Sequence, residues 1–197
     1  MSARAAALVV ALIAAAAASV ASRRALAVTD LAALPADAAR AADDVFFDLT
    51  GYRFMSGWLE AATKPEHAAN VAAMRAAEDR YSIPRNLVVR LAWQESRFDP
   101  QASNPSGASG IMQIVPRWHP GVDPLNPLAA IDYGARFLSQ LYRQFGTWEL
   151  ALKAYNWGPG NVQKWLDSAR QSFEPLETRN YSAQILADLA DAGMGVA

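Results

Sequence analysis

The 197-residue sequence contains no cysteine and only two histidines. The absence of cysteine excludes a disulfide scaffold and a thiolate nucleophile. His67 and His119 lie far apart in the sequence, and no carboxylates accompany them at the spacing of metal ligands. A zinc site is therefore not indicated, and the sequence predicts neither a bound metal nor a cofactor.

Charged residues are also scarce, at 19% of the chain, whereas 52% is hydrophobic and the net charge is −1. Three of the 18 basic residues and none of the 19 acidic residues lie in the first 27 positions, which leaves 15 basic against 19 acidic residues in the rest. A mildly acidic body argues against nucleic acid as a partner. The length suits one globular domain with a sizeable core and an N-terminal extension.

The first 27 residues have the composition of a targeting segment. Arg4 precedes an unbroken run of small and apolar residues, Ala5–Ala21, which is the form of a secretory signal peptide. The alternative is a retained membrane anchor, although the run falls a little short of a comfortable membrane span. We therefore expect export to the periplasm or cell envelope, with membrane contact only through this segment.

The remainder divides into two expected parts. Residues 28–65 form an N-terminal extension that carries an aromatic patch of no clear period between Val45 and Trp58. These rings either pack on the outside of the main domain or offer an extra surface to a polymer or partner, and the role of the extension is left open. Residues 66–197 form the main domain.

The main domain is expected to be helical, because no segment shows a convincing alternation of apolar and polar residues. Residues 101–110 have the composition of a loop, rich in serine, glycine, asparagine and proline. Periodicity and end signals predict helices over 66–81, from Pro84 (with Ser82 as its cap) to a stop at Asp99-Pro100, over 127–145, over about 147–155, and after a cap at Asn161.

Glu95 is the acidic residue that this pattern singles out. In a helix that begins near Pro84, Glu95 follows Leu91 by four residues and Ala92 by three, so it continues the core-facing stripe. A carboxyl group in that place is partly desolvated, which raises its pKa and lets it donate a proton near neutral pH. The alternative is a glutamate at a helix end that turns out to solvent, and helical phase alone does not decide between the two.

Neutral hydrogen-bonding side chains accompany Glu95 in the sequence, and such a set suits a sugar. They are Gln94, Ser103, Asn104, Gln113, Tyr155 and Asn156. Phosphate would require basic groups, and residues 100–116 contain none. No serine, histidine and aspartate arrangement for nucleophilic catalysis is supported either.

Four motifs in order resemble those of the soluble lytic transglycosylase (SLT domain) family, whose fold is similar to goose-type lysozyme. They are Gln94-Glu95-Ser96, GASGIMQIVP over residues 107–116, AYNWGPG over 154–160 and ETRNY over 177–181. The resemblance covers about residues 80–185. It implies a compact all-α domain within the lysozyme-like superfamily, which is classed as α+β, preceded by a helical extension. It further implies cleavage of the β-1,4 bond between N-acetylmuramic acid and N-acetylglucosamine in peptidoglycan, with a 1,6-anhydro end and Glu95 as the single acid and base.

The resemblance also implies substrate-binding residues. Gln113 and Tyr155 match positions that line the cleft, with Tyr155 placed to hydrogen-bond near the catalytic carboxyl group. Asn156 is expected to hold the loop, and Glu177 to bind on the far side of the cleft, although a packing role stays open for both. The family often has serine nine residues after the catalytic glutamate; Asn104 stands there with Ser103 before it, which bears on subsite preference and not on the reaction.

Two other functions compete with this interpretation. An enzyme of the same fold could hydrolyse the glycan as goose-type lysozyme does, but no second acid lies near residues 107–113, and Asp99 resembles a helix stop. A non-catalytic domain could instead serve as a structural piece of an envelope-spanning secretion, conjugation or phage assembly, although such a piece has no need of a buried acid. Peptidoglycan glycan strands are the expected partner, and an envelope-spanning machine is left open as a second.

Overall fold

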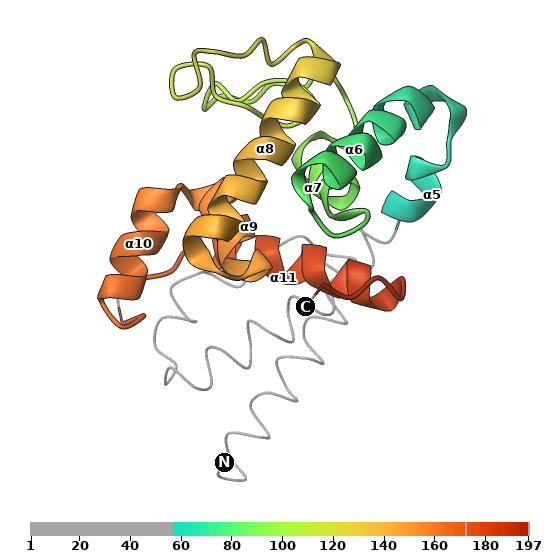
Figure 1. Ribbon diagram of the computed structural model, residues 1–197. Coiled ribbons are helices and arrows are strands. Elements are labelled where there is room, and N and C mark those ends of the chain that lie inside the picture. Colours follow the sequence, from blue (N-terminus) through green and yellow to red (C-terminus); the bar gives the residue numbers. More distant parts are fainter. Residues whose placement is uncertain (1–56, 172, 197) are drawn as a thin grey trace, which may run out of the picture. The chain divides into compact units, whose positions relative to one another are not determined.

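The computed structural model describes residues 57–171 and 173–196, and the predicted leader and most of the predicted extension lie outside them. The described part is helical, and its only β-pairings are isolated bridges of Ser109 with Ser103 and with Ile114. The expected all-α fold is confirmed. The elements are α5 (Trp58–Ala62), the 3-10 helix η2 (Pro65–His67), α6 (Ala68–Tyr81), α7 (Leu87–Ser96), α8 (Pro127–Phe145), α9 (Trp148–Trp157), α10 (Pro159–Asp167) and α11 (Leu176–Asp191) (Figure 1).

The short helix α7 lies at the centre of the packing. It contacts α5, α6 and α11, while α8 packs between α6 and α9, and α9 in turn contacts α10 and α11 (Figure 1). Leu87, Val88 and Leu91 of α7 are fully buried. A helix whose apolar face meets several neighbours is fixed in position by that burial, so α7 is a rigid support for the side chains at its end.

The start of α7 differs from the prediction. The helix begins at Leu87, because Asn86 before it has a positive φ of 65°. Ser82 does not cap it: this residue ends α6 in the left-handed conformation, with φ 55°, so that prediction is wrong. The cap comes instead from Glu78 of α6, whose carboxylate accepts the backbone N–H groups of Asn86 (2.8 Å), Val88 (2.9 Å) and Val89 (3.3 Å).

The end of α7 also comes earlier than predicted. Arg97 and Phe98 both take a positive φ, at 57° and 66°, so the helix ends at Ser96 before the expected stop at Asp99-Pro100 is reached. The Ser96 hydroxyl donates to the Ile111 carbonyl at 2.9 Å. That bond joins the end of α7 to the loop that follows it, and this loop is where the second motif lies.

The predicted bounds of α8 are confirmed, and α9 ends two residues beyond the predicted 147–155. The Asn126 side chain accepts the Ala129 N–H at 3.2 Å, and Gly146 ends α8 with φ 80°. The Thr147 hydroxyl caps α9 by accepting the Leu150 N–H at 3.2 Å. The expected cap at Asn161 is wrong: α10 already begins at Pro159, and the Asn161 side chain donates to the carbonyl of Trp157 at 2.7 Å.

The predicted loop over 101–110 is present and folds tightly back on the segment that follows it. Gly110 has φ 75°, and a Cβ atom there would lie 1.8 Å from the Pro124 carbonyl oxygen. Only glycine fits such a close backbone approach with a positive φ. Within the described ranges, no helix combines the length and apolar character needed to cross a bilayer.

Candidate active site

Glu95 lies in the last turn of α7, directly after the buried stripe. Leu91 and Ala92 before it are fully buried and Glu95 itself is partly buried, so the helical phase expected from the sequence is confirmed. Burial of the carboxyl group raises the pKa of Glu95 to about 7, because desolvation disfavours the charged form. The raised pKa expected for this residue is confirmed, and the carboxyl group is divided between its acid and base forms near neutrality.

Tyr181 of α11 is the direct hydrogen-bond partner of Glu95. Its hydroxyl group donates to Oε1 of the carboxyl group, and this bond lowers the pKa of Glu95, opposing the effect of burial. Burial and the neighbouring charge of Glu95 raise the pKa of Tyr181 well above its usual value. The hydroxyl group therefore keeps its proton and stays a donor.

Glu177 lies one helical turn before Tyr181 on α11 and is exposed. Its negative charge raises the pKa of Glu95 further, since two like charges disfavour each other. Burial, the charge of Glu177 and the hydrogen bond from Tyr181 thus set the pKa of this carboxyl group. Desolvation and Glu177 favour the acid form, and Tyr181 favours the carboxylate.

Tyr155 of α9 lies within electrostatic reach of Glu95, because the charge of that residue raises the pKa of Tyr155. Its hydroxyl group donates to the Met112 carbonyl at 3.0 Å and not to the carboxyl group. Gly134 of α8 makes room for this contact, since a Cβ atom there would lie 3.1 Å from the Tyr155 hydroxyl and 2.8 Å from Cε of Met112. Tyr155 therefore ties the second motif to α9 beside Glu95.

Asn104 and Gln113 join the two ends of the loop. The side-chain oxygen of Asn104 accepts the N–H groups of Ser106 (2.9 Å) and Ala108 (3.1 Å), and its nitrogen donates to Oε1 of Gln113 at 3.3 Å. Nε2 of Gln113 donates to the carbonyls of Ala102 and Gly110. Both amides thus hold the shape of the loop.

Ser103 and Asn156 are the remaining expected site residues. Ser103 is exposed and forms an isolated β-bridge with Ser109. The side-chain oxygen of Asn156 accepts the hydroxyl group of Thr178 at 2.8 Å, which joins α9 to α11. In the described part of the chain, no hydrogen bond joins either of these side chains to Glu95.

Sequence reasoning did not single out Tyr181 as a site residue. It lies in the fourth motif, and its distance of one helical turn from Glu177 places both on one side of α11. The sequence therefore indicates that Glu177 and Tyr181 lie on one face of the same helix. The hydrogen bond from Tyr181 to Glu95 spans 86 positions of sequence, which no local pattern shows.

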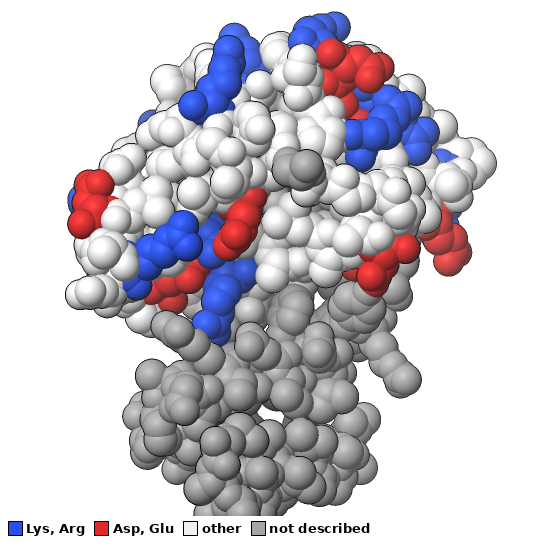
Figure 2. All heavy atoms as spheres, turned by 60° about the horizontal axis from the view of Figure 1, so that its bottom comes forward, with Lys and Arg blue, Asp and Glu red and all other residues white. Residues whose placement is uncertain are grey.

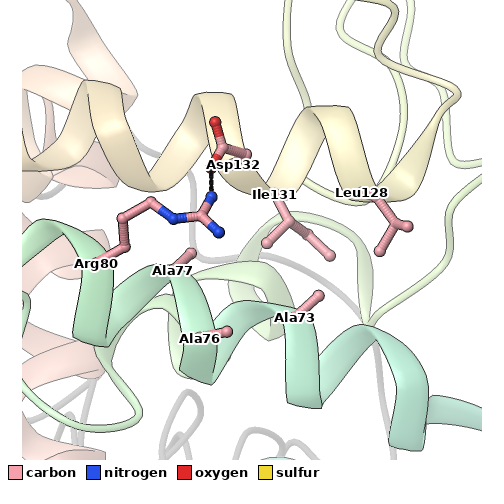
Figure 3. Close-up of a pocket in the computed structure, with 7 residues that line it drawn as sticks. All are labelled: Ala73, Ala76, Ala77, Arg80, Leu128, Ile131 and Asp132. Carbon is pink, nitrogen blue, oxygen red and sulfur yellow. Dashed lines mark hydrogen bonds and ion pairs between the residues drawn. The ribbon is translucent and has the colours of Figure 1, made fainter.

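A pocket of about 190 Å³ lies elsewhere, between α6 and α8 (Figure 3). Alanine, leucine and isoleucine side chains and the ion pair of Arg80 with Asp132 line it. None of its lining residues is Glu95 or a hydrogen-bond partner of Glu95. In residues 57–171 and 173–196, no three histidine or acidic side chains gather closely enough to hold a metal ion.

Surface charge is mixed on one face of the described helices. On the face shown in Figure 2, basic and acidic side chains are interspersed and most of the surface is uncharged. A face of this kind lacks the one-signed field that a nucleic-acid backbone requires. Such a surface is compatible with a neutral polymer such as a glycan.

The sequence matches known proteins over the segment that carries this site. The profile of the transglycosylase SLT domain family matches residues 72–175, which is more than half of the chain. The soluble lytic murein transglycosylase of Escherichia coli K12 is 34% identical over 128 residues, covering 53% of this chain and 20% of that protein. The peptidoglycan transglycosylase gp16 of Escherichia phage T7 is 33% identical over 133 residues, covering 60% of this chain and 10% of that protein.

Solved structures agree with the sequence matches. The 70 kDa soluble lytic transglycosylase of Escherichia coli aligns with a TM-score of 0.53 and 31% identity, over 59% of this chain and 23% of that one. The same transglycosylase in complex with bulgecin A gives a TM-score of 0.54 and 30% identity, over 64% of this chain and 24% of that one. This chain thus spans about a fifth of the length of the first curated relatives it matches. With its four motifs, its helical fold and the profile match over residues 72–175, the chain belongs to the transglycosylase SLT domain family.

Proposed function

We propose that this chain is a peptidoglycan lytic transglycosylase that cleaves the β-1,4 bond between N-acetylmuramic acid and N-acetylglucosamine, with Glu95 as its single acid and base. The observation that carries the proposal is the partly buried Glu95 carboxyl group, with a pKa of about 7 and a hydrogen bond from Tyr181. General acid and base catalysis is most effective when the pKa lies near the working pH. A carboxyl group in this state can give up a proton and take one back.

In the first step, the protonated Glu95 donates its proton to the glycosidic oxygen as the bond from C1 to that oxygen breaks. N-acetylglucosamine leaves with a 4-hydroxyl group, and the N-acetyl group of the muramic acid stabilises the cationic C1. The hydrogen bond from Tyr181 stabilises the carboxylate that this step creates. Burial raises the share of Glu95 that carries the proton near neutral pH.

In the second step, the carboxylate of Glu95 removes the proton from the 6-hydroxyl group of the same muramic acid. The 6-oxygen bonds to C1 and closes the 1,6-anhydro ring, and Glu95 regains the proton that it lost. No water is consumed, so a desolvated site favours this ring closure over hydrolysis. One carboxyl group performs both proton transfers, whereas most glycosidases need two.

The proposed substrate and location follow the same relatives. Relatives carry the names murein transglycosylase and peptidoglycan transglycosylase, which supports glycan strands of the cell wall as the substrate here. Action in the periplasm or cell envelope, reached through residues 1–27, is part of the proposal. The division of the chain at residues 27 and 65 and recruitment by an envelope-spanning machine stay predictions.

The test is digestion of purified peptidoglycan by the full chain and by Glu95→Gln, followed by mass spectrometry of the released muropeptides. The lytic reaction is expected to give fragments lighter than hydrolysis products by the mass of one water molecule, and Glu95→Gln is expected to release none. Retained activity in Glu95→Gln would show that another group supplies the proton.

Hydrolysis of the same bond is the second candidate, because one further acid acts on the site. Glu177 is the carboxylate whose charge raises the pKa of Glu95, and a second carboxylate could activate water. A hydrolase is expected to yield fragments that retain the water, and to lose its activity in Glu177→Gln. Anhydro products that persist in Glu177→Gln decide for the lytic reaction.

A further inference from the structure

The polar contacts that join α7 to α11 include one at the candidate acid and one further back along both helices. At the end of α7, Glu95 accepts the hydroxyl group of Tyr181. Further back on α7, Nε of Arg90 donates to Oδ2 of Asp188 at 2.6 Å. The two helices pack directly on each other (Figure 1).

The Arg90–Asp188 pair is buried. The Arg90 side chain is 0% exposed and the Asp188 side chain 8%. Nη1 of Arg90 also donates to Oε1 of Gln94 at 3.0 Å, whereas its Nη2 is buried without a hydrogen-bond partner. An incompletely satisfied buried ion pair is a poor source of stability, because its desolvation cost rivals its attraction. Its directional geometry, in contrast, restricts how the two helices can lie.

The spacing along α11 couples the two contacts. Asp188 follows Tyr181 by seven residues, which is about two turns of a helix, so both side chains lie on one face of α11. Arg90 precedes Glu95 by five residues on α7, about 140° around the helix, and both side chains nevertheless reach α11. A slide or rotation of α11 that breaks one contact therefore displaces the other.

We propose that Arg90 and Asp188 are positioning residues: their buried ion pair sets the register of α11 against α7 and so keeps the Tyr181 hydroxyl group on Glu95. Neither residue touches the reacting atoms. The inference rests on the proposed function for its effect on catalysis, but its effect on Glu95 itself is measurable without substrate.

The groups around Glu95 determine how its pKa changes when α11 loses this register against α7. Tyr181 and Glu177 face it from α11, and Tyr155 lies near it on α9. Of the causes that act on the pKa of Glu95, only the hydrogen bond from Tyr181 lowers it; desolvation and Glu177 raise it. If Tyr181 moves away, the pKa of Glu95 rises above about 7.

The experiment titrates the Glu95 carboxyl carbon by NMR in protein labelled with ¹³C-glutamate, with Glu95→Gln to assign the signal. Tyr181→Phe gives the benchmark shift. The test variant is the double substitution Arg90→Met with Asp188→Leu, because apolar residues of similar size replace a buried ion pair without loss of folding in favourable cases. Asp188→Glu is the second variant, since it keeps both charges and moves the carboxylate by one methylene group.

The matched control is Asp132→Asn, which removes an exposed ion pair with Arg80 that joins α6 to α8 (Figure 3). In the double variant, Glu95 is expected to titrate at a higher pH than in the wild type, toward its value in Tyr181→Phe. The melting temperature is expected to stay near that of the wild type. The variant's rate of muropeptide release is expected to fall about tenfold. Asp132→Asn is expected to change neither the titration of Glu95 nor the rate of muropeptide release.

The proposal is overturned if Glu95 titrates at the same pH as in the wild type in any folded variant of the Arg90–Asp188 pair. If the double variant does not fold, Asp188→Glu decides by the same criterion. The two proposals fail separately: wild-type protein that releases no anhydro products refutes the lytic function, whereas the titration of Glu95 still decides whether the pair positions Tyr181.

Discussion

At the scale of single residues, the site is a balance of effects on one carboxyl group. Burial and the charge of Glu177 raise the pKa of Glu95, and the hydrogen bond from Tyr181 lowers it. The result is a pKa of about 7, at which neither protonation state dominates. A residue that must act as an acid and then as a base needs this balance.

The first prediction concerns Glu177. Replacing it by glutamine removes a like charge, so the pKa of Glu95 is expected to fall. Because the acid form of Glu95 starts the reaction, the falling arm of the activity profile is expected to move to lower pH, by about one unit or less. The measurement is the rate of muropeptide release between about pH 5 and pH 9.

Glu60→Gln is the control for this shift, since Glu60 is an exposed glutamate on α5. It is expected to leave the profile in place. A profile of Glu177→Gln that coincides with the wild type would contradict the electrostatic role of Glu177, and a shift to higher pH would reverse its sign.

The second prediction concerns stability and pH. The pKa of Glu95 is about 7 in the folded chain against an ordinary value of 4.5, so the folded state binds the proton more tightly. Its contribution to the free energy of unfolding is complete below about pH 4.5 and is lost as the pH rises through about 7. Glu95→Gln is therefore expected to gain about 3 kcal/mol relative to the wild type between those limits.

Urea unfolding of both proteins at about pH 4 and about pH 8 measures this difference. The relative stability of Glu95→Gln is expected to rise with pH. A difference that stays constant would mean that the carboxyl group of Glu95 has an ordinary pKa in the folded protein.

The site residues divide according to whether a local pattern reveals them. Helical phase links Glu95 to Leu91 and Ala92, only a turn away, but it left open whether the side chain faces the core or solvent. Tyr181 was not predictable, because its contact with Glu95 joins residues 86 positions apart. The hydrogen bond of Tyr155 to Met112 likewise depends on tertiary packing and on the absence of a side chain at Gly134.

At the scale of elements, α7 depends on its neighbours for both of its ends. Glu78 of α6 accepts three N–H groups at its start, and the Ile111 carbonyl accepts the Ser96 hydroxyl at its end. A helix of ten residues is marginal by itself. The position of Glu95 is therefore set from outside the helix that carries it.

The third prediction tests the cap at the start of α7. Glu78→Gln keeps the size of the side chain but replaces one acceptor oxygen by an N–H donor, which then faces a backbone N–H group. A buried unsatisfied donor costs about 1–3 kcal/mol, and we expect that loss in the free energy of unfolding. Urea denaturation measures it.

Asp79→Asn is the matched control, because Asp79 is the next residue on α6 and is exposed, at 77% of its side chain. Its substitution is expected to change stability by less than about 0.5 kcal/mol. Equal effects of the two substitutions would show that Glu78 is not a cap of α7.

Element boundaries show the same division between local and tertiary causes. The ends of α8 and the start of α9 follow from residues within a turn, namely Asn126, Gly146 and Thr147. The start of α7 does not, because the capping carboxylate comes from the preceding helix. Asn161 resembles a cap in sequence, but Pro159 has already begun α10.

At the scale of the whole molecule, the core of the family fold extends beyond the matched segment. The family profile begins at residue 72, whereas Trp58, Ala61 and Ala62 of α5 are buried in the same core. Helix α5 packs against α7. The helix that carries Glu95 is thus supported from α5 on one part of its surface and from α11 on another.

The fourth prediction follows from this placement of α5. Trp58 is 3% exposed, whereas its neighbour Leu59 is 38% exposed. Trp58→Ala in the full chain is expected to cost about 3–5 kcal/mol of unfolding free energy through lost burial and a cavity, and Leu59→Ala less than about 1 kcal/mol. Urea denaturation compares the two. If both substitutions cost equally little, α5 contributes no packing energy to the domain, and the boundary expected near residue 65 describes the folding unit better than one near residue 57.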